Sequence, residues 1–208
     1  TYLQTVKEDQ SMHDQDPSPN GPADQAESAD AALKHIVDGF LHFHHEVFPQ
    51  QEELFKKLAT AQTPRAMFIT CADSRIVPEL ITQSSPGDLF VTRNVGNVVP
   101  PYGQMNGGVS TAIEYAVLAL GAPLILVLGH ESCGAFAAAI KTTKDDTVFP
   151  GQIQKLTLSL KPVVEKVLKQ PGDLLLNATV QNVKDTVQTL KSASPVLTQA
   201  ISDGKLKI

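Results

Sequence analysis

Two short segments carry side chains that could bind one metal ion together. CADSR, at residues 71–75, contains Cys71, and GHESCG, at residues 129–134, contains His130 and Cys133. The 208-residue chain has two cysteines in all, which excludes a dense disulfide framework. Three interpretations of these cysteines remain open. They could be inert buried thiols, which is the usual case, they could form one disulfide, or they could act as metal ligands or nucleophiles.

The positions of the two segments favour a shared metal. Each directly follows an expected strand, and the carboxyl ends of parallel strands line one crevice, so Cys71 can approach the other two residues. The spacing His130-x-x-Cys133 lets one turn direct both side chains at the same ion. Cys133 would also begin a helix, where the helix dipole favours a thiolate. Three ligands of the type Cys₂His leave one tetrahedral position open, which is typical of catalytic zinc.

The residues around Cys71 could tune such a metal. Two thiolates and one imidazole cancel the charge of Zn²⁺, so the ion would acidify bound water less than in an all-histidine site. Asp73 could accept a hydrogen bond from metal-bound water, and Arg75 could hold Asp73 ionised in a two-pronged ion pair. Each residue alone has an ordinary explanation: a cysteine in the core, a histidine that caps a turn, an Asp-x-Arg pair in a solvated loop. Their joint occurrence at two strand ends favours the metal site.

The elements that must position these side chains predict an α/β fold with a mostly parallel central β-sheet flanked by helices. Apolar runs at residues 66–70, 89–93 and 124–128 read as strands and alternate with helical stretches, as βαβ units do. Helices are expected at 108–120, from 134 onward, at 152–169, at 174–191 and at 195–202, and residues 206–208 could add an edge strand.

The beginning of the chain differs in composition. Residues 1–29 are rich in Pro, Gly, Ser, Asp and Gln, which predicts a polar arm or disordered tail ahead of a single domain at 30–208. From residue 30 an amphipathic helix is expected, an N-terminal helical arm that Pro49 ends or bends, with a second helix near 51–59. Its apolar positions have three-and-four spacing: Leu33, Ile36, Val37, Phe40, Phe43, Val47 and Phe48.

The overall composition excludes two classes of partner. The formal net charge is −5 and no cluster of Lys and Arg occurs, which argues against a nucleic-acid surface. No apolar run approaches the ~18 to 20 residues of a membrane span. Residues 1–26 lack the pattern of a secretory signal, so we expect a cytoplasmic protein or an equivalent reducing compartment.

As a set, the motifs resemble those of β-class carbonic anhydrases, particularly the plant-like branch. The resemblance rests on CADSR, GHESCGA, RNVGN at 93–97 and GGVSTAIEYAV at 107–117, and it extends from about residue 30 to the C-terminus. It implies one Zn²⁺ per subunit, bound by Cys71, His130 and Cys133, with Asp73 and Arg75 as the catalytic dyad. The implied activity is the interconversion of CO₂ and bicarbonate by attack of zinc-bound hydroxide.

The resemblance also implies a pocket for CO₂, which maps to Gln62, Phe90, Val95 and Tyr115, with Gly134 giving room or a backbone donor. An apolar wall suits an uncharged substrate, and an amide N–H can polarise one oxygen as negative charge develops. Without the resemblance, Phe90, Val95 and Tyr115 would be interpreted as ordinary strand and helix core.

Family members form homodimers or larger homo-oligomers in which N-terminal helices embrace the partner, and the apolar face of the first helix suits that role. In the same region His42, His44 and His45 could relay protons or bind metal, although exposed helix-face histidines are the favoured interpretation. Two other functions stay open. One is hydrolysis of carbonyl sulfide or carbon disulfide on the same scaffold, and the other is a zinc-stabilised assembly protein without activity, against which the intact Asp73 and Arg75 argue.

Overall fold

The computed structural model describes residues 27–103, 108–192 and 194–208. The chain divides into two compact units, residues 1–56 and 57–208, and each is described here by itself. Most of the polar arm predicted at 1–29 lies outside the described residues, so that prediction stays untested.

The first unit is helical, as its apolar spacing predicted. Helix α1, Ala29–His42, begins at Ser28, whose side chain accepts the N–H of Ala31. Such a side-chain cap satisfies one of the free N–H groups of a first helical turn. The chain continues through a π-helical turn, Phe43–Val47, and a 3-10 turn, Pro49–Gln51, into α2, Glu52–Thr60. Pro49 therefore changes the type of helix without ending the helical run.

An aromatic cluster holds the turn of this unit together. The ring of Phe48 lies 6.2 Å from that of Phe43 and 5.2 Å from that of Phe55. The apolar face of α1 has no such cover within the unit, because Ile36 and Phe40 are each 68% exposed. An exposed apolar stripe of this kind is typical of a surface that packs against another element or another chain.

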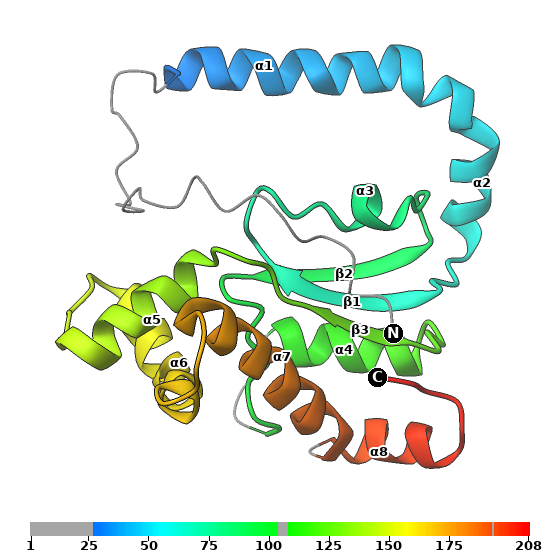
Figure 1. Ribbon diagram of the computed structural model, residues 1–208. Helices are drawn as coiled ribbons and strands as arrows, with labels where there is room; N and C mark the ends of the chain where they lie inside the picture. The colour runs from blue at the N-terminus through cyan, green and yellow to red at the C-terminus, as the bar shows by residue number, and fades with distance from the viewer. Residues whose placement is uncertain (1–26, 104–107, 193) are drawn as a thin grey trace. The chain divides into compact units, whose positions relative to one another are not determined.

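The second unit is built on a parallel sheet in the order β2-β1-β3, which Figure 1 shows edge to edge. Its strands are β1, Ala66–Cys71, β2, Leu89–Asn94, and β3, Ile125–Leu128, within one residue of the predicted bounds. All six residues of β1 are buried, which explains its apolar sequence AMFITC, since a central parallel strand is covered on both faces. The register places Cys71 opposite Asn94 and Thr70 opposite Leu128, so the three strands end at one edge.

The predicted edge strand at 206–208 is present only as a single β-bridge. Lys207 makes a single parallel bridge to Leu124, in which the N–H of Ile125 donates to the Lys207 carbonyl at 2.8 Å. The bridge anchors the end of the chain beside β3 without extending the sheet by a full strand.

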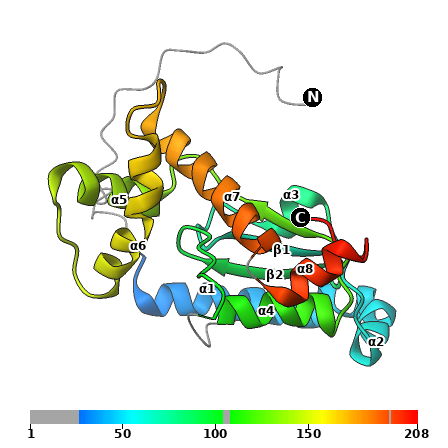
Figure 2. The same ribbon diagram turned by 90° about the horizontal axis from the view of Figure 1, so that it is seen from below.

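Helices cover the sheet in two groups. Their bounds are α3, Pro78–Thr82, α4, Gly108–Leu118, α5, Gly134–Asp145, α6, Gln152–Val167, α7, Leu174–Ser192, and α8, Pro195–Ser202. Helix α4 packs on β1 and β2 with α8 beside it, while α5, α6 and α7 pack on one another (Figure 2). Helix α3 was not predicted, because its five residues are too few to show a period. Among the described residues, no helix is both long and apolar enough to span a bilayer.

Two buried cores lie under these helices, and α7 contributes to both. One core joins Met67, Ile69 and Ile125 of the sheet to α4, α7 and α8. The other joins Cys71 and Cys133 to buried side chains of α5, α6 and α7, including Phe136 and Val164. The two cysteines therefore sit at the inner wall of a well-packed region, where side chains have little freedom to move.

Candidate metal centre

The structure brings the three predicted ligands together. The donor atoms of Cys71, His130 and Cys133 all lie within 4.8 Å of one another. Cys71 is the last residue of β1, His130 follows β3, and Cys133 is the N-cap of α5. Both thiols are buried and free, which rules out the disulfide interpretation. Among the described residues, this is the group of His, Cys, Asp and Glu side chains that could hold a metal ion.

The orientation of the imidazole fits a metal ligand. Nδ1 of His130 lies 2.8 Å from the carbonyl oxygen of Glu131, to which it donates a hydrogen bond. A neutral imidazole that donates from Nδ1 keeps its lone pair on Nε2. Nε2 is buried and has no hydrogen-bond partner in the protein. A buried polar atom without a partner is costly, and a divalent cation beside the two thiols would satisfy it.

The pKa of the Cys133 thiol is set mainly by its burial. Burial, and next the neighbouring Cys71, raises the pKa of Cys133 to about 11, while the N–H groups of Phe136 and Ala135 act in the opposite direction. The prediction that Cys133 begins a helix is correct, and the N–H groups of that helix favour the thiolate as expected. Desolvation in the packed core outweighs the helix N-terminus. A divalent cation would reverse the balance and release the thiol proton on binding.

Arg75 holds Asp73 beside these ligands. Nε and Nη2 of Arg75 each donate to one Asp73 carboxylate oxygen at 2.8 Å, and the Arg75 N–H adds a bond of 3.0 Å. These bonds, side chain first and backbone second, hold the pKa of Asp73 well below its usual range. Oδ2 of Asp73 lies 3.9 Å from Nε2 of His130. An ionised carboxylate is therefore fixed next to the ligand group.

Further contacts, which the sequence did not indicate individually, fix the two loops. Nη2 of Arg75 also donates to the Ser132 carbonyl at 3.1 Å and so joins the loop after β1 to the loop after β3. Arg93, the first residue of RNVGN, donates to the carbonyls of Cys71, at 3.1 Å, and Asp73, at 2.7 Å. The Gly96 N–H lies 3.4 Å from Sγ of Cys71. The RNVGN motif was the one available signal for Arg93 and Gly96.

Of the five predicted substrate residues, Phe90 packs against a buried core and the other four are exposed. Val95 and Tyr115 are 54% and 50% exposed, so their interpretation as ordinary core is wrong. Phe90 is half-buried, and its ring centroid lies 6.0 Å from that of Tyr115. Gln62, on the segment before β1, and Gly134, the first residue of α5, are exposed in the single chain. The structure thus pairs Phe90 with Tyr115 and leaves Gln62, Val95 and Gly134 exposed on the surface.

The histidines of the first unit follow the favoured interpretation. His42, His44 and His45 are all exposed, the last two in the π-helical turn. The ring centroids of His44 and His45 lie 5.2 Å apart.

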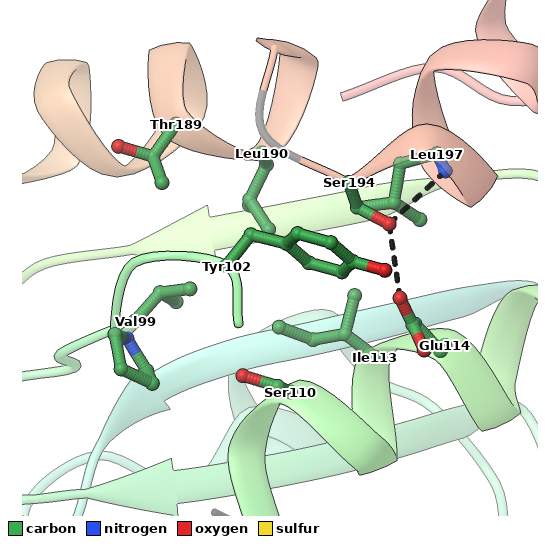
Figure 3. Close-up of a pocket in the computed structure, with 10 residues that line it drawn as sticks. Val99, Tyr102, Ser110, Ile113, Glu114, Thr189, Leu190, Ser194 and Leu197 are labelled. Atoms are coloured by element: carbon green, nitrogen blue, oxygen red, sulfur yellow. Dashed lines mark hydrogen bonds between the residues drawn. The ribbon is translucent and has the colours of Figure 1, made fainter. Parts of the chain in front are cut away.

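A small pocket lies among α4, the end of α7 and α8. Ser194 donates to Oε1 of Glu114 at 3.0 Å and accepts the N–H of Leu197 at 3.4 Å, which caps α8. In Figure 3 the ring of Tyr102 lies across this pocket with its hydroxyl end toward the Ser194–Glu114 pair. The cavity measures about 30 Å³, and the metal ligands do not line it. It has room for roughly one water molecule.

Comparison with known proteins places the chain in one family. Residues 66–208 match the family model described as carbonic anhydrase. A carbonic anhydrase of Synechococcus elongatus is 37% identical over 180 residues, which cover 85% of this chain and 66% of that protein. A carbonic anhydrase of Pseudomonas aeruginosa is 56% identical over 106 residues, which cover 51% and 48%. The chain thus matches between about half and two thirds of the length of these relatives.

Solved structures agree with this placement. The β-carbonic anhydrase CcaA is 33% identical, with a TM-score of 0.73 over 85% of this chain and 87% of that one. A Coccomyxa β-carbonic anhydrase, solved with acetazolamide, is 29% identical, with a TM-score of 0.72 over 86% and 78%. The branch within the β class stays a prediction. With its Cys₂His donor group at the ends of parallel strands and these similarities along most of its length, the chain belongs to the β-carbonic anhydrase family.

Proposed function

We propose that the protein is a zinc lyase that catalyses the reversible hydration of CO₂ to bicarbonate. The observation that carries this proposal is the convergence of two buried thiols and an unpartnered imidazole nitrogen beside an Asp73 carboxylate that Arg75 fixes. A donor group of three with a neighbouring carboxylate suits a metal that acts on water, because the fourth position stays free.

Zinc bound there would act as a Lewis acid that makes water a nucleophile near neutral pH. The side chains of the protein set its surroundings. Asp73 accepts a hydrogen bond from the reacting water and thereby orients the water lone pair toward the substrate. Arg75 keeps Asp73 ionised and unable to rotate. His130 is held in the correct tautomer by the Glu131 carbonyl.

We assign the substrate pocket to Gln62, Phe90, Val95, Tyr115 and Gly134. The paired rings of Phe90 and Tyr115 give an apolar wall for CO₂, and the Gln62 amide can donate to an oxygen that gains negative charge. Because Gln62, Val95 and Tyr115 are exposed in the single chain, a second copy of the chain is needed to enclose the substrate.

This requirement favours a homodimer or a larger homo-oligomer. The exposed apolar face of α1 supports the same proposal, since Ile36 and Phe40 would be costly to leave in water. A solved chain that is 27% identical to this one, with a TM-score of 0.73, comes from a study of two β-carbonic anhydrases of Sordaria macrospora that are described as tetrameric. We also propose a cytoplasmic or equally reducing location, because the thiols must stay reduced to bind metal.

The test is stopped-flow CO₂ hydration by the zinc-loaded protein, compared with Asp73→Asn and a control, Asp146→Asn. Asp146 is exposed at the C-terminal end of α5, and its left-handed backbone suits asparagine equally well. We expect hydration by the wild type and the control and a loss of about 100-fold or more in the Asp73 variant, the usual scale for a group that orients the reacting proton. Wild-type protein that turns over carbonyl sulfide and leaves CO₂ unhydrated would overturn the proposal, and so would an Asp73 variant with full activity.

A further inference from the structure

Gly96 lies at a junction between the loop after β2, the Cys71 thiol and helix α5. Its backbone has φ +80°, which side chains rarely allow, and a Cβ at this position would lie 3.0 Å from Cβ of Ala135. The glycine is therefore needed both for its conformation and for its close approach to α5. Its N–H points at Sγ of Cys71, with a nitrogen–sulfur distance of 3.4 Å.

The carbonyl of the same residue is held from a distant part of the chain. Nδ2 of Asn182, on α7, donates to the Gly96 oxygen at 3.3 Å, and both partners are buried. Asn182 is only 5% exposed although it carries a full amide. Burying an amide is unfavourable unless it gains hydrogen bonds, so its place here indicates a specific role in holding the loop.

The hydrogen bond from Gly96 to Cys71 would change how much charge the thiolate donates to a bound metal. A thiolate that accepts an N–H hydrogen bond donates less charge to a bound cation, so the cation keeps more of its power to polarise water. Two thiolates and a neutral imidazole otherwise cancel the charge of a divalent ion. By drawing charge from the Cys71 thiolate, the Gly96 N–H thus helps the bound cation keep its power to polarise water.

We propose that Asn182 is a positioning residue of the metal centre. It fixes Gly96 from α7, so that the Gly96 N–H stays bonded to the Cys71 thiolate and sets both the retention of the metal and its electron density. The proposal rests on the proposed function only for the presence of zinc at Cys71, His130 and Cys133. It requires no assumption about the substrate.

The experiment compares Asn182→Leu and Asn182→Asp with the wild type. Leucine has a similar size and no amide, and aspartate has the same shape without the Nδ2 donor. Thr186→Val is the matched control, because Thr186 is also 5% exposed and lies one turn further along α7. Two properties are measured on each protein: the rate at which a chelator removes zinc, and the thiolate-to-metal charge-transfer absorption of the cobalt-substituted form.

We expect zinc removal to be about tenfold faster in the Asn182 variants, the lower end of the usual effect of losing an outer partner of a ligand. The charge-transfer band should move to lower energy, because a thiolate with a weaker hydrogen bond gives up an electron more readily. The Thr186 variant should match the wild type in both properties. A lower melting temperature without either change, or the same changes in the control, would show that Asn182 only packs α7 and would overturn the proposal.

A measurement on the wild type covers the case in which both Asn182 variants fail to fold. In protein loaded with ¹¹³Cd and labelled with ¹⁵N, the bond predicts a scalar coupling between the metal and the amide proton of Gly96. Spectra that show coupling to the cysteine β-protons and none to Gly96 would overturn the proposal. None of these readouts uses CO₂, so an inactive protein that shows them would refute the proposed function alone, and an active protein that lacks them would refute this inference alone.

Discussion

Gly129 lies directly before His130, and α7 packs against it so closely that a methyl group has no room. A Cβ at this position would lie 2.9 Å from Cγ2 of Thr179 and 3.0 Å from Cγ2 of Val183. Both neighbours are β-branched residues of a helix, which rotate little. We predict that Gly129→Ala lowers the free energy of unfolding, although the backbone of Gly129 is not among the glycines with positive φ.

The size of the effect follows from two opposing contributions. Inserting a methyl group into a packed region costs about 1 to 3 kcal/mol. Replacing glycine also restricts the unfolded chain, which stabilises the protein by about 0.4 to 1 kcal/mol. The midpoints of the two ranges give a net loss of about 1.3 kcal/mol, or a fall in melting temperature of about 3 to 5 °C for a chain of this length.

The assay is urea unfolding of Gly129→Ala, Thr179→Ser and the double variant. Serine removes the clashing methyl group and keeps the hydroxyl that donates to the Leu175 carbonyl at 3.0 Å. If the clash causes the loss, the double variant should be more stable than the sum of the single effects by about 1 kcal/mol. Gly108→Ala is the control, because a Cβ there meets nothing within 4 Å. Additive effects, or a Gly129 variant as stable as the wild type, would refute the steric argument.

Three further outcomes are expected. Arg75→Lys keeps the positive charge but loses the two-pronged grip on Asp73, so kcat/KM for CO₂ should fall about 100-fold while the zinc content stays unchanged. Cys133→Ser should lose stoichiometric zinc, and chelation of the wild type should lower its melting temperature toward that of this variant. Asp88→Asn should destabilise the protein at neutral pH, because the N–H of Ser85, as the largest contribution, lowers the pKa of the folded carboxyl. A lowered folded pKa contributes stability above the unfolded value of about 3.9, so in urea unfolding the difference from the wild type should shrink as the pH falls below about 4.

Each of these outcomes has a result that would contradict it. An Arg75→Lys variant that has lost its zinc would place the arginine among the supports of the metal rather than of Asp73. Full zinc occupancy in Cys133→Ser would exclude this thiol as a ligand. A difference between Asp88→Asn and wild type that stays constant from neutral to acid pH would mean that the Asp88 charge contributes nothing to folding.

Local patterns in the sequence were sufficient for most elements. The strands beginning at Ala66 and Leu89 were predicted within one residue, because a run of buried apolar residues bounded by polar turns has few other solutions. Helix α8, Pro195–Ser202, was predicted to the residue, because a capping serine and a proline mark its start. The short helix α3 and the π-helical turn after α1 escaped prediction, since neither has a period of its own.

The metal ligands were accessible from the sequence for a topological reason. Parallel strands joined by helices must end at the same edge of the sheet, so residues directly after β1 and β3 are brought together whatever the details of packing. The identities of Cys71, His130 and Cys133 then determine which metal fits. The ion pair between Asp73 and Arg75 was equally accessible, because two residues in one turn can meet without help from the rest of the chain.

The tertiary structure decided the properties that depend on burial and on distant partners. The sequence placed Cys133 at a helix start, where the N–H groups favour a thiolate. Packing against side chains of α5 and α6 desolvates the thiol, and this larger effect raises its pKa to about 11. Asn182 reaches Gly96 across 86 positions of the chain, and no local pattern could reveal that bond. Spacing along the chain fixes which groups can meet at a strand end, while the dielectric around them and the partners that hold them are set by atoms from the whole fold.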